Sequence, residues 1–138
     1  MQHVLATTLI VLLGCAAAGD SDQTAMPTAE VAMSVEPSNA TAGDSLTLTL
    51  SNESSGPVGY NLCSSRLERS AGNDWEPIRE NRMCTLELRT LPPGEQTTYS
   101  VQLPPTIEPG EYRFATNVEM LDGTARNLVR STTFRVTE

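Results

Sequence analysis

Three cysteines and one histidine are the residues of this chain with the widest chemistry. The cysteines are Cys15, Cys63 and Cys84, and the histidine is His3. A thiol can act as a nucleophile, bind a metal, form a disulfide or carry a lipid, but Cys–His catalysis also requires an imidazole. We expect His3 to lie in a segment that is removed on export. The sequence therefore favours anchoring and structural roles for the cysteines over catalysis.

The first cysteine follows an apolar segment. Residues 4–13, VLATTLIVLL, form a run that is shorter than the ~20 residues of a transmembrane helix and is typical of a signal-peptide core. The run ends in Leu12, Leu13, Gly14 and Cys15, which resemble the lipobox of bacterial lipoproteins. The resemblance implies cleavage before Cys15, which becomes an N-terminus modified with palmitate or related acyl chains. Two or more such chains anchor a protein stably to a membrane.

The residues around the cysteine leave an alternative open for this terminus. Ala16 follows Cys15, where an Asp would favour the inner membrane, so the resemblance implies the outer membrane if the source is Gram-negative. An ordinary signal peptide cut near AAAG would instead leave a soluble secreted protein. We predict a lipid-anchored location in the bacterial cell envelope.

The segment after Cys15 is small and polar. Residues 16–30, AAAGDSDQTAMPTAE, hold too few large apolar side chains to build a core. The predicted organisation is a lipoprotein signal peptide at 1–14, a lipidated N-terminus and flexible linker at 15–30, and one folded domain at 31–138.

Alternation of apolar and polar residues begins at Val31 and is interrupted by turn residues every eight to twelve positions. This pattern predicts an all-β fold. The alternating segments lie at 31–35, 46–50, 58–62, 83–91, 99–103, 112–118 and 132–136, with a hairpin from RLERS through AGND to WEPI. Their number and spacing match an immunoglobulin-like antiparallel sandwich, for which we predict seven or eight strands.

Three turn-rich segments carry a further resemblance. SNESSGPVGYNL, LRTLPPGEQTTYSVQLP and EPGEYRFATNV look like parts of bacterial envelope Ig-like modules. They are also similar to the BsuPI-type family of proteinase inhibitors, over roughly residues 46 to 120. The chain departs from that family in its export signal and in its cysteine pair. The resemblance implies a sandwich fold, adds proteinase inhibition as an alternative function, and assigns no inhibitory residues.

Tyr112 directly follows the turn EPGE. It stands where a tyrosine corner would lock a crossing loop by a hydroxyl-to-backbone hydrogen bond. By its place in the alternation, the same residue could instead simply fill the core.

Cys63 and Cys84 remain as an even pair once Cys15 is assigned to the lipid. In an oxidising compartment we expect them to form a disulfide. The bridge would enclose about 22 residues and contribute roughly 3 kcal/mol to stability by the chain-entropy model. A redox role would favour closer spacing, such as C-x-x-C.

The interval from Arg66 to Arg89 concentrates charge around the only tryptophan. It holds five of the nine arginines and five acids. Because Arg and Trp are enriched at binding hot spots, one interpretation is a partner-binding face. The other makes Trp75 a core or hairpin residue and the charges a solvated edge. The candidate interface residues are Arg66, Arg69, Trp75, Arg79 and Arg82.

Composition and charge exclude several functions. The formal charge of −8, without a single lysine, argues against nucleic acid as a partner. Paired carboxylates among Glu76, Glu80 and Glu87 could hydrolyse glycosides, but sandwiches of this size seldom enclose a substrate cleft. We therefore predict a non-enzymatic, lipid-anchored Ig-like module without cofactor or metal, which contacts a protein or glycan of the envelope. A periplasmic or surface proteinase inhibitor is the alternative.

Overall fold

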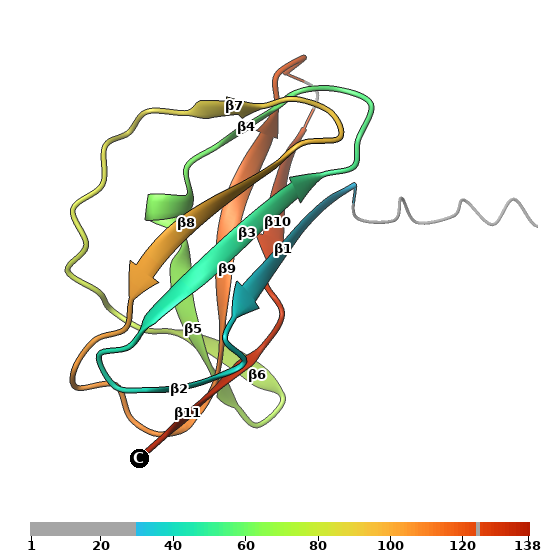
Figure 1. Cartoon of the computed structure of the whole chain (residues 1–138). Helices are drawn as coiled ribbons and strands as arrows, with labels where there is room; N and C mark the ends of the chain where they lie inside the picture. Colours follow the sequence, from blue (N-terminus) through green and yellow to red (C-terminus); the bar gives the residue numbers. More distant parts are fainter. Residues whose placement is uncertain (1–29, 124) are drawn as a thin grey trace, which may run out of the picture.

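The computed structural model describes residues 30–123 and 125–138 (Figure 1). Leu12, Leu13, Gly14 and Cys15 lie outside these residues. The described part contains eleven β-strands and one short 3-10 helix. These are β1 (Val31–Glu36), β2 (Asn39–Thr41), β3 (Ser45–Asn52), β4 (Val58–Tyr60), the 3-10 helix (Leu62–Ser64), β5 (Arg66–Ala71), β6 (Asp74–Pro77), β7 (Arg89–Leu91), β8 (Gln96–Gln102), β9 (Gly110–Met120), β10 (Arg126–Arg130) and β11 (Phe134–Thr137).

The strands form two sheets packed face to face. The smaller sheet has the order β1-β3-β8. In the larger sheet the long strand β9 pairs with β10 and β11 on one side and with β4 and β5 on the other. Strands β2, β7 and β6 extend that sheet next to β11, β4 and β5 respectively. All strand pairs are antiparallel except β2 with β11, so the predicted all-β antiparallel sandwich is confirmed.

Period-two alternation positions the core between the sheets. In β3, Leu46, Leu48 and Leu50 are buried while the intervening residues face outward, as a half-buried strand requires. The larger sheet contributes Phe114 and Phe134, whose ring centroids lie 5.7 Å apart. Stacked aromatic pairs of this kind add to the free energy of area burial.

The predicted count of seven or eight strands is too low. Five of the eleven strands have only three or four residues. Strands β2 and β10 lie outside the predicted alternating segments, because their residues show no sustained alternation. β2 exists because Ala40 aligns with Val136 of β11, almost a hundred residues away, a pairing with no local signal.

Two predicted strands are shorter than the alternation indicates. The segment at 58–62 is a strand only to Tyr60, after which the chain turns through the 3-10 helix and resumes as β5. The predicted strand at 83–91 is wrong except for β7. β7 pairs with β4, whose last paired residue is Tyr60 opposite Arg89. Residues before Arg89 therefore face a helical turn instead of a strand.

The predicted hairpin is confirmed by the pairing of β5 with β6. Ala71 aligns with Asp74 across a turn made by Gly72 and Asn73. Gly72 has a φ of 72°, a left-handed conformation that glycine adopts without steric cost. The hairpin brings Trp75 next to Ser70 on a strand that pairs with β9.

Tyr112 both fills the core and forms a tyrosine corner. The side chain is buried in the core, and its hydroxyl donates a 2.6 Å hydrogen bond to the Glu108 carbonyl oxygen, as in a tyrosine corner. Burial raises the pKa of Tyr112; the Arg69 guanidinium opposes this shift and the Glu108 carboxylate adds to it. The folded protein therefore favours the neutral phenol, which can donate.

Replacing Tyr112 by Phe should lower the free energy of unfolding by about 1 kcal/mol at neutral pH, because the Glu108 carbonyl loses its donor. The raised pKa means that this contribution is present below about pH 10 and is lost as pH rises through the folded-state pKa. Urea unfolding at pH 7 and pH 11 checks both statements. Equal stability of the two proteins at pH 7 would contradict the corner, and an equal difference at both pH values would contradict the raised pKa.

Candidate functional site

The two most exposed large apolar side chains of the described residues lie on one loop between β6 and β7. We call residues 79–88 the stapled loop. In Figure 1 the loop forms an arc at one flank of the sandwich. Met83 is 97% exposed and Leu86 is 99% exposed, while Leu88 is 47% exposed. Side chains of this size are more often buried, so the exposure of Met83 and Leu86 makes this loop a candidate contact surface.

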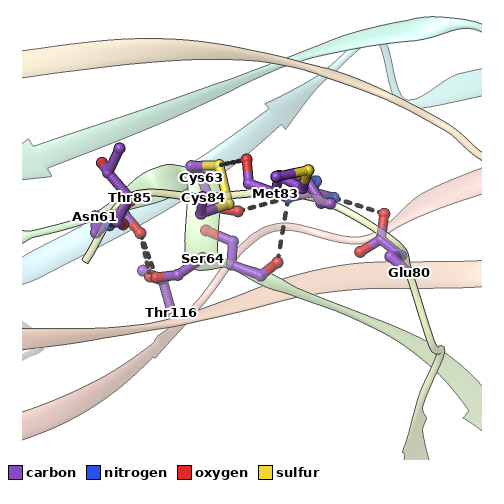
Figure 2. Close-up of a disulfide and its surroundings, with 10 residues drawn as sticks. Asn61, Cys63, Ser64, Glu80, Met83, Cys84, Thr85 and Thr116 are labelled. Carbon is purple, nitrogen blue, oxygen red and sulfur yellow. Dashed lines mark hydrogen bonds and ion pairs between the residues drawn. A yellow bond between two sulfur atoms is a disulfide. The ribbon is translucent and has the colours of Figure 1, made fainter. Parts of the chain in front are cut away.

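A disulfide holds the middle of the stapled loop. It joins Cys84 to Cys63 of the 3-10 helix, with the two Cα atoms 5.7 Å apart. Figure 2 shows a second attachment beside it, in which the Asn61 side-chain amide donates a 2.6 Å hydrogen bond to the Thr85 carbonyl oxygen. Both attachments lie within two residues of Leu86. The backbone next to this exposed leucine is therefore restrained.

Arg82 restrains the first half of the stapled loop. Its guanidinium donates to the Cys63 carbonyl oxygen at 2.9 Å and to the Ser65 carbonyl oxygen at 3.3 Å. The same group forms an ion pair of 2.6 Å with Glu80. Because these donors are already used within the chain, Arg82 positions the loop instead of offering a free charge to a partner.

A hollow of about 330 Å³ lies between the stapled loop and β5. It is lined by Glu80 and Arg82 of the loop, by Arg66 of β5, and by Ser65, which lies between the 3-10 helix and β5. The loop thus does not pack closely against the sheet along this stretch. The disulfide and the polar contacts, instead of apolar packing, hold it in place.

Arg66 and Trp75 lie on the face of the larger sheet that points away from the core. There Arg113 of β9 places its guanidinium 4.1 Å from the centre of the Trp75 ring. Arg113 also donates a 2.8 Å hydrogen bond to Glu68, which Arg66 approaches to 3.6 Å. Trp75 is half-buried by this stack. It packs on the outside of the sheet and does not enter the core.

Arg69 and Arg79 occupy other places. Arg69 forms an ion pair with Glu108 and donates a 3.0 Å hydrogen bond to the Pro109 carbonyl oxygen, next to Tyr112. The hydrogen bond with Glu108 raises the pKa of Arg69. Arg79 is exposed at the start of the stapled loop. The structure thus gathers Arg66, Arg79 and Arg82 around the loop and separates Arg69 from them.

The carboxylates singled out for hydrolytic chemistry are dispersed. Glu80 is engaged by Arg82, whereas Glu76 and Glu87 are exposed on β6 and on the stapled loop. Within residues 30–123 and 125–138, no group of three or more His, Cys, Asp or Glu residues is placed to hold a metal ion. The part of the chain that the structure describes also has no helix of the length and apolarity needed to cross a membrane.

A family model described as a bacterial Ig-like domain matches residues 27–132. The chain belongs to the bacterial Ig-like domain family. The match spans β1 to β10 and includes the stapled loop, and it confirms the Ig-like part of the predicted fold. Membership of this family indicates a structural or binding module.

Solved structures show the same fold as this Ig-like domain at low sequence identity. A crystal structure of a protein assigned as ApaA from Bordetella pertussis has a TM-score of 0.54 and 20% identity, over 76% of this chain and 90% of that one. The X-ray structure of the structural-genomics target SoR45 has a TM-score of 0.51 and 15% identity, over 78% of this chain and 85% of that one. No curated protein matches the chain.

Proposed function

We propose that the protein is a lipid-anchored binding protein of the bacterial envelope. The lipobox resemblance of Leu12, Leu13, Gly14 and Cys15 supports attachment through Cys15. The predicted linker at 15–30 then separates the Ig-like domain from the membrane surface. Family membership supports a binding module in place of an enzyme.

The observation that carries the binding function is the stapled loop. Met83 and Leu86 are almost fully exposed, yet a disulfide and the Asn61 amide restrain the backbone between and beside them. An exposed apolar surface that is already rigid loses little conformational entropy on association. Its partner is therefore a protein that accepts large apolar side chains.

Replacing Cys15 by Ser should abolish lipid labelling. Cells grown with an alkyne fatty acid should incorporate the label into the wild-type protein in the membrane fraction, because the acyl chains attach at Cys15. A Cys63→Ser variant is the matched control and should keep its label. Equal labelling of the wild type and the Cys15→Ser variant would refute the anchor, as would an unlabelled wild type.

A proteinase inhibitor is the second candidate function. It is supported by the turn resemblance to the BsuPI-type family together with the stapled loop, which presents an exposed segment on a rigid support. Protease–inhibitor complexes form on pre-organised surfaces that move little on binding. Steady-state rates of proteinases of several classes, measured with and without the protein, test this candidate.

A further inference from the structure

We infer that the free edge of β8 binds β8 of a second copy of this chain, so that two smaller sheets join about a two-fold axis at Tyr99. This interaction surface is separate from the contact proposed for the stapled loop. It goes beyond the proposed binding function, because it adds a specific self-association of the domain.

β8 is an unpaired edge strand. Among the described residues it pairs only with β3, and β1 lies on the other side of β3 (Figure 1). An edge strand is a template for another strand unless charges, proline, a bulge or a covering segment protect it. The seven residues of β8, QTTYSVQ, include no charged residue, proline or glycine. The strand therefore lacks the side chains that usually block pairing at an edge.

The other edge strands of the described residues are short, charged or covered. β2 and β7 have three residues each. β6 carries Asp74, Glu76 and Pro77, and β10 begins and ends with an arginine. β1 is covered at Met33, whose carbonyl oxygen accepts a hydrogen bond from the Thr132 N–H. A pairing of β8 with β8 therefore uses up the one unprotected edge of each copy and closes at two chains.

Hydrogen bonds at the two ends of the β3–β8 pair show which main-chain groups of β8 are free. The Leu103 N–H donates to the Asp44 carbonyl oxygen at 2.8 Å. At the other end, the Asn52 N–H donates to the Glu95 carbonyl oxygen at 2.9 Å. Residues that bond to the neighbouring strand alternate with residues whose N–H and C=O point away. The odd-numbered residues of β8 therefore bond to β3, and the even-numbered ones direct their N–H and C=O groups to the free edge.

The sequence of β8 is close to a palindrome centred on Tyr99. Two such edges pair only where residues with outward main-chain groups stand opposite each other. An antiparallel pair centred on Tyr99 meets this condition over the whole strand, with Gln96 opposite Gln102 and Thr98 opposite Ser100 of the second copy. Cross-strand hydroxyl pairs of this kind stabilise a sheet. A shift by two residues would leave two residues of each strand unpaired, so the centred register is favoured.

The stapled loop does not fill the space beside β8. A hollow of about 570 Å³ lies between its first residues and the end of β8, with Arg79 and Arg82 on one side and Gln102 on the other. All four residues with outward main-chain groups are exposed. A second strand can therefore reach these groups.

A proline at Ser100 tests the main-chain pairing in the chain carrying Cys15→Ser. Sedimentation equilibrium of this chain should show a monomer–dimer equilibrium. Ser100→Pro removes an N–H that points to the free edge, where proline is tolerated in a monomer, and urea unfolding should confirm that the fold is kept. The dimer loses one hydrogen bond per copy, so its dissociation constant should rise at least about tenfold. Ser100→Ala keeps the N–H and is the matched control, which should leave the constant unchanged.

A cysteine at the two-fold axis tests the register in the same background. Tyr99 would face its own copy in a pair without mutual hydrogen bonds, with Cα atoms about 4.5 Å apart, which is within the range of a disulfide. Mild oxidation of Tyr99→Cys should therefore give a covalent dimer on a non-reducing gel. Thr97→Cys is the matched control. It would face Val101 of the second copy, and the two cysteines would lie about 13 Å apart, too far to form a disulfide.

The other outcomes would overturn the inference and leave the proposed binding function standing. A monomer at all concentrations would exclude the dimer. A dimer that Leu86→Arg disperses and Ser100→Pro does not would assign self-association to the stapled loop. A dimer without the Tyr99→Cys cross-link, or with equal cross-linking of Thr97→Cys, would contradict the register. In cells, an adduct of Tyr99→Cys with a different protein, in place of the homodimer, would assign the edge to a foreign strand.

Discussion

Replacing Cys63 and Cys84 together by serine should lower the free energy of unfolding by roughly 3 kcal/mol. The disulfide spans a sequence separation of 21 residues, and closing a loop of this length restricts the unfolded chain by that amount in the chain-entropy model. Urea unfolding measures the effect in a Cys15→Ser background, in which Cys63 and Cys84 are the only cysteines. A loss below about 1 kcal/mol would show that the remaining contacts already restrain the segment.

The same double variant should also expose the stapled loop to cleavage. Without the disulfide, the loop keeps the hydrogen bonds from Arg82 to Cys63 and Ser65 and the hydrogen bond from Asn61. The first two are half-buried and the third is exposed to solvent. Limited proteolysis should therefore cut within residues 79–88 well before the sandwich unfolds. Reduced wild-type protein provides the control and should show the same pattern. Cuts that begin in the sheets would contradict this local role.

The sequence was sufficient for features whose signal is local or compositional. The alternation of Leu46, Leu48 and Leu50 with threonines predicts β3, because period-two burial needs only the strand itself. The residues AGND predict the hairpin, because glycine adopts the left-handed backbone conformation that Gly72 has in this turn. The pair Cys63 and Cys84 followed from an even count once Cys15 was assigned elsewhere, and the structure joins these two residues.

The stapled loop could not be predicted in this way, because alternation does not reveal whether a partner strand exists. Leu86 and Leu88 alternate with polar residues as buried strand residues do, yet both are exposed, since β4 ends at Tyr60. Asn61 holds Thr85 across 24 residues, and no local pattern marks that contact. That Leu86 and Leu88 are exposed, although they alternate with polar residues as buried strand residues do, follows only from the three-dimensional structure.

The predicted interface shows a second limit of sequence reasoning. Clustering in the sequence brought Arg66, Arg69, Arg79 and Arg82 together as candidates, but a side chain's role depends on which groups it meets. Arg82 and Arg69 meet backbone carbonyl oxygens and acids of their own chain. Arg113, which stacks on Trp75, was not among the candidates because it lies on β9, far away in the sequence.

Replacing Arg113 by Met should lower the free energy of unfolding by about 3 kcal/mol. Glu68 is only 7% exposed, and Arg113 donates to it at 2.8 Å. Without Arg113, the carboxylate keeps only Arg66 at 3.6 Å, and removing one partner of a buried ion pair typically costs 3–5 kcal/mol. The lower end applies because water still reaches part of this pair. Chemical denaturation of the single variant measures the loss.

A double-mutant cycle distinguishes the ion pair from the packing of Arg113 on Trp75. Glu68→Met together with Arg113→Met leaves no unpaired charge, so the double variant should be more stable than Arg113→Met alone. Arg66→Met is the matched control; because Arg66 is largely exposed, it should cost less than about 1 kcal/mol. If the double variant is as unstable as the single one, the stack on Trp75 dominates. In either case Arg113 occupies one face of the Trp75 ring, so the half-buried Trp75 offers a partner less apolar surface than the almost fully exposed Met83 and Leu86 of the stapled loop.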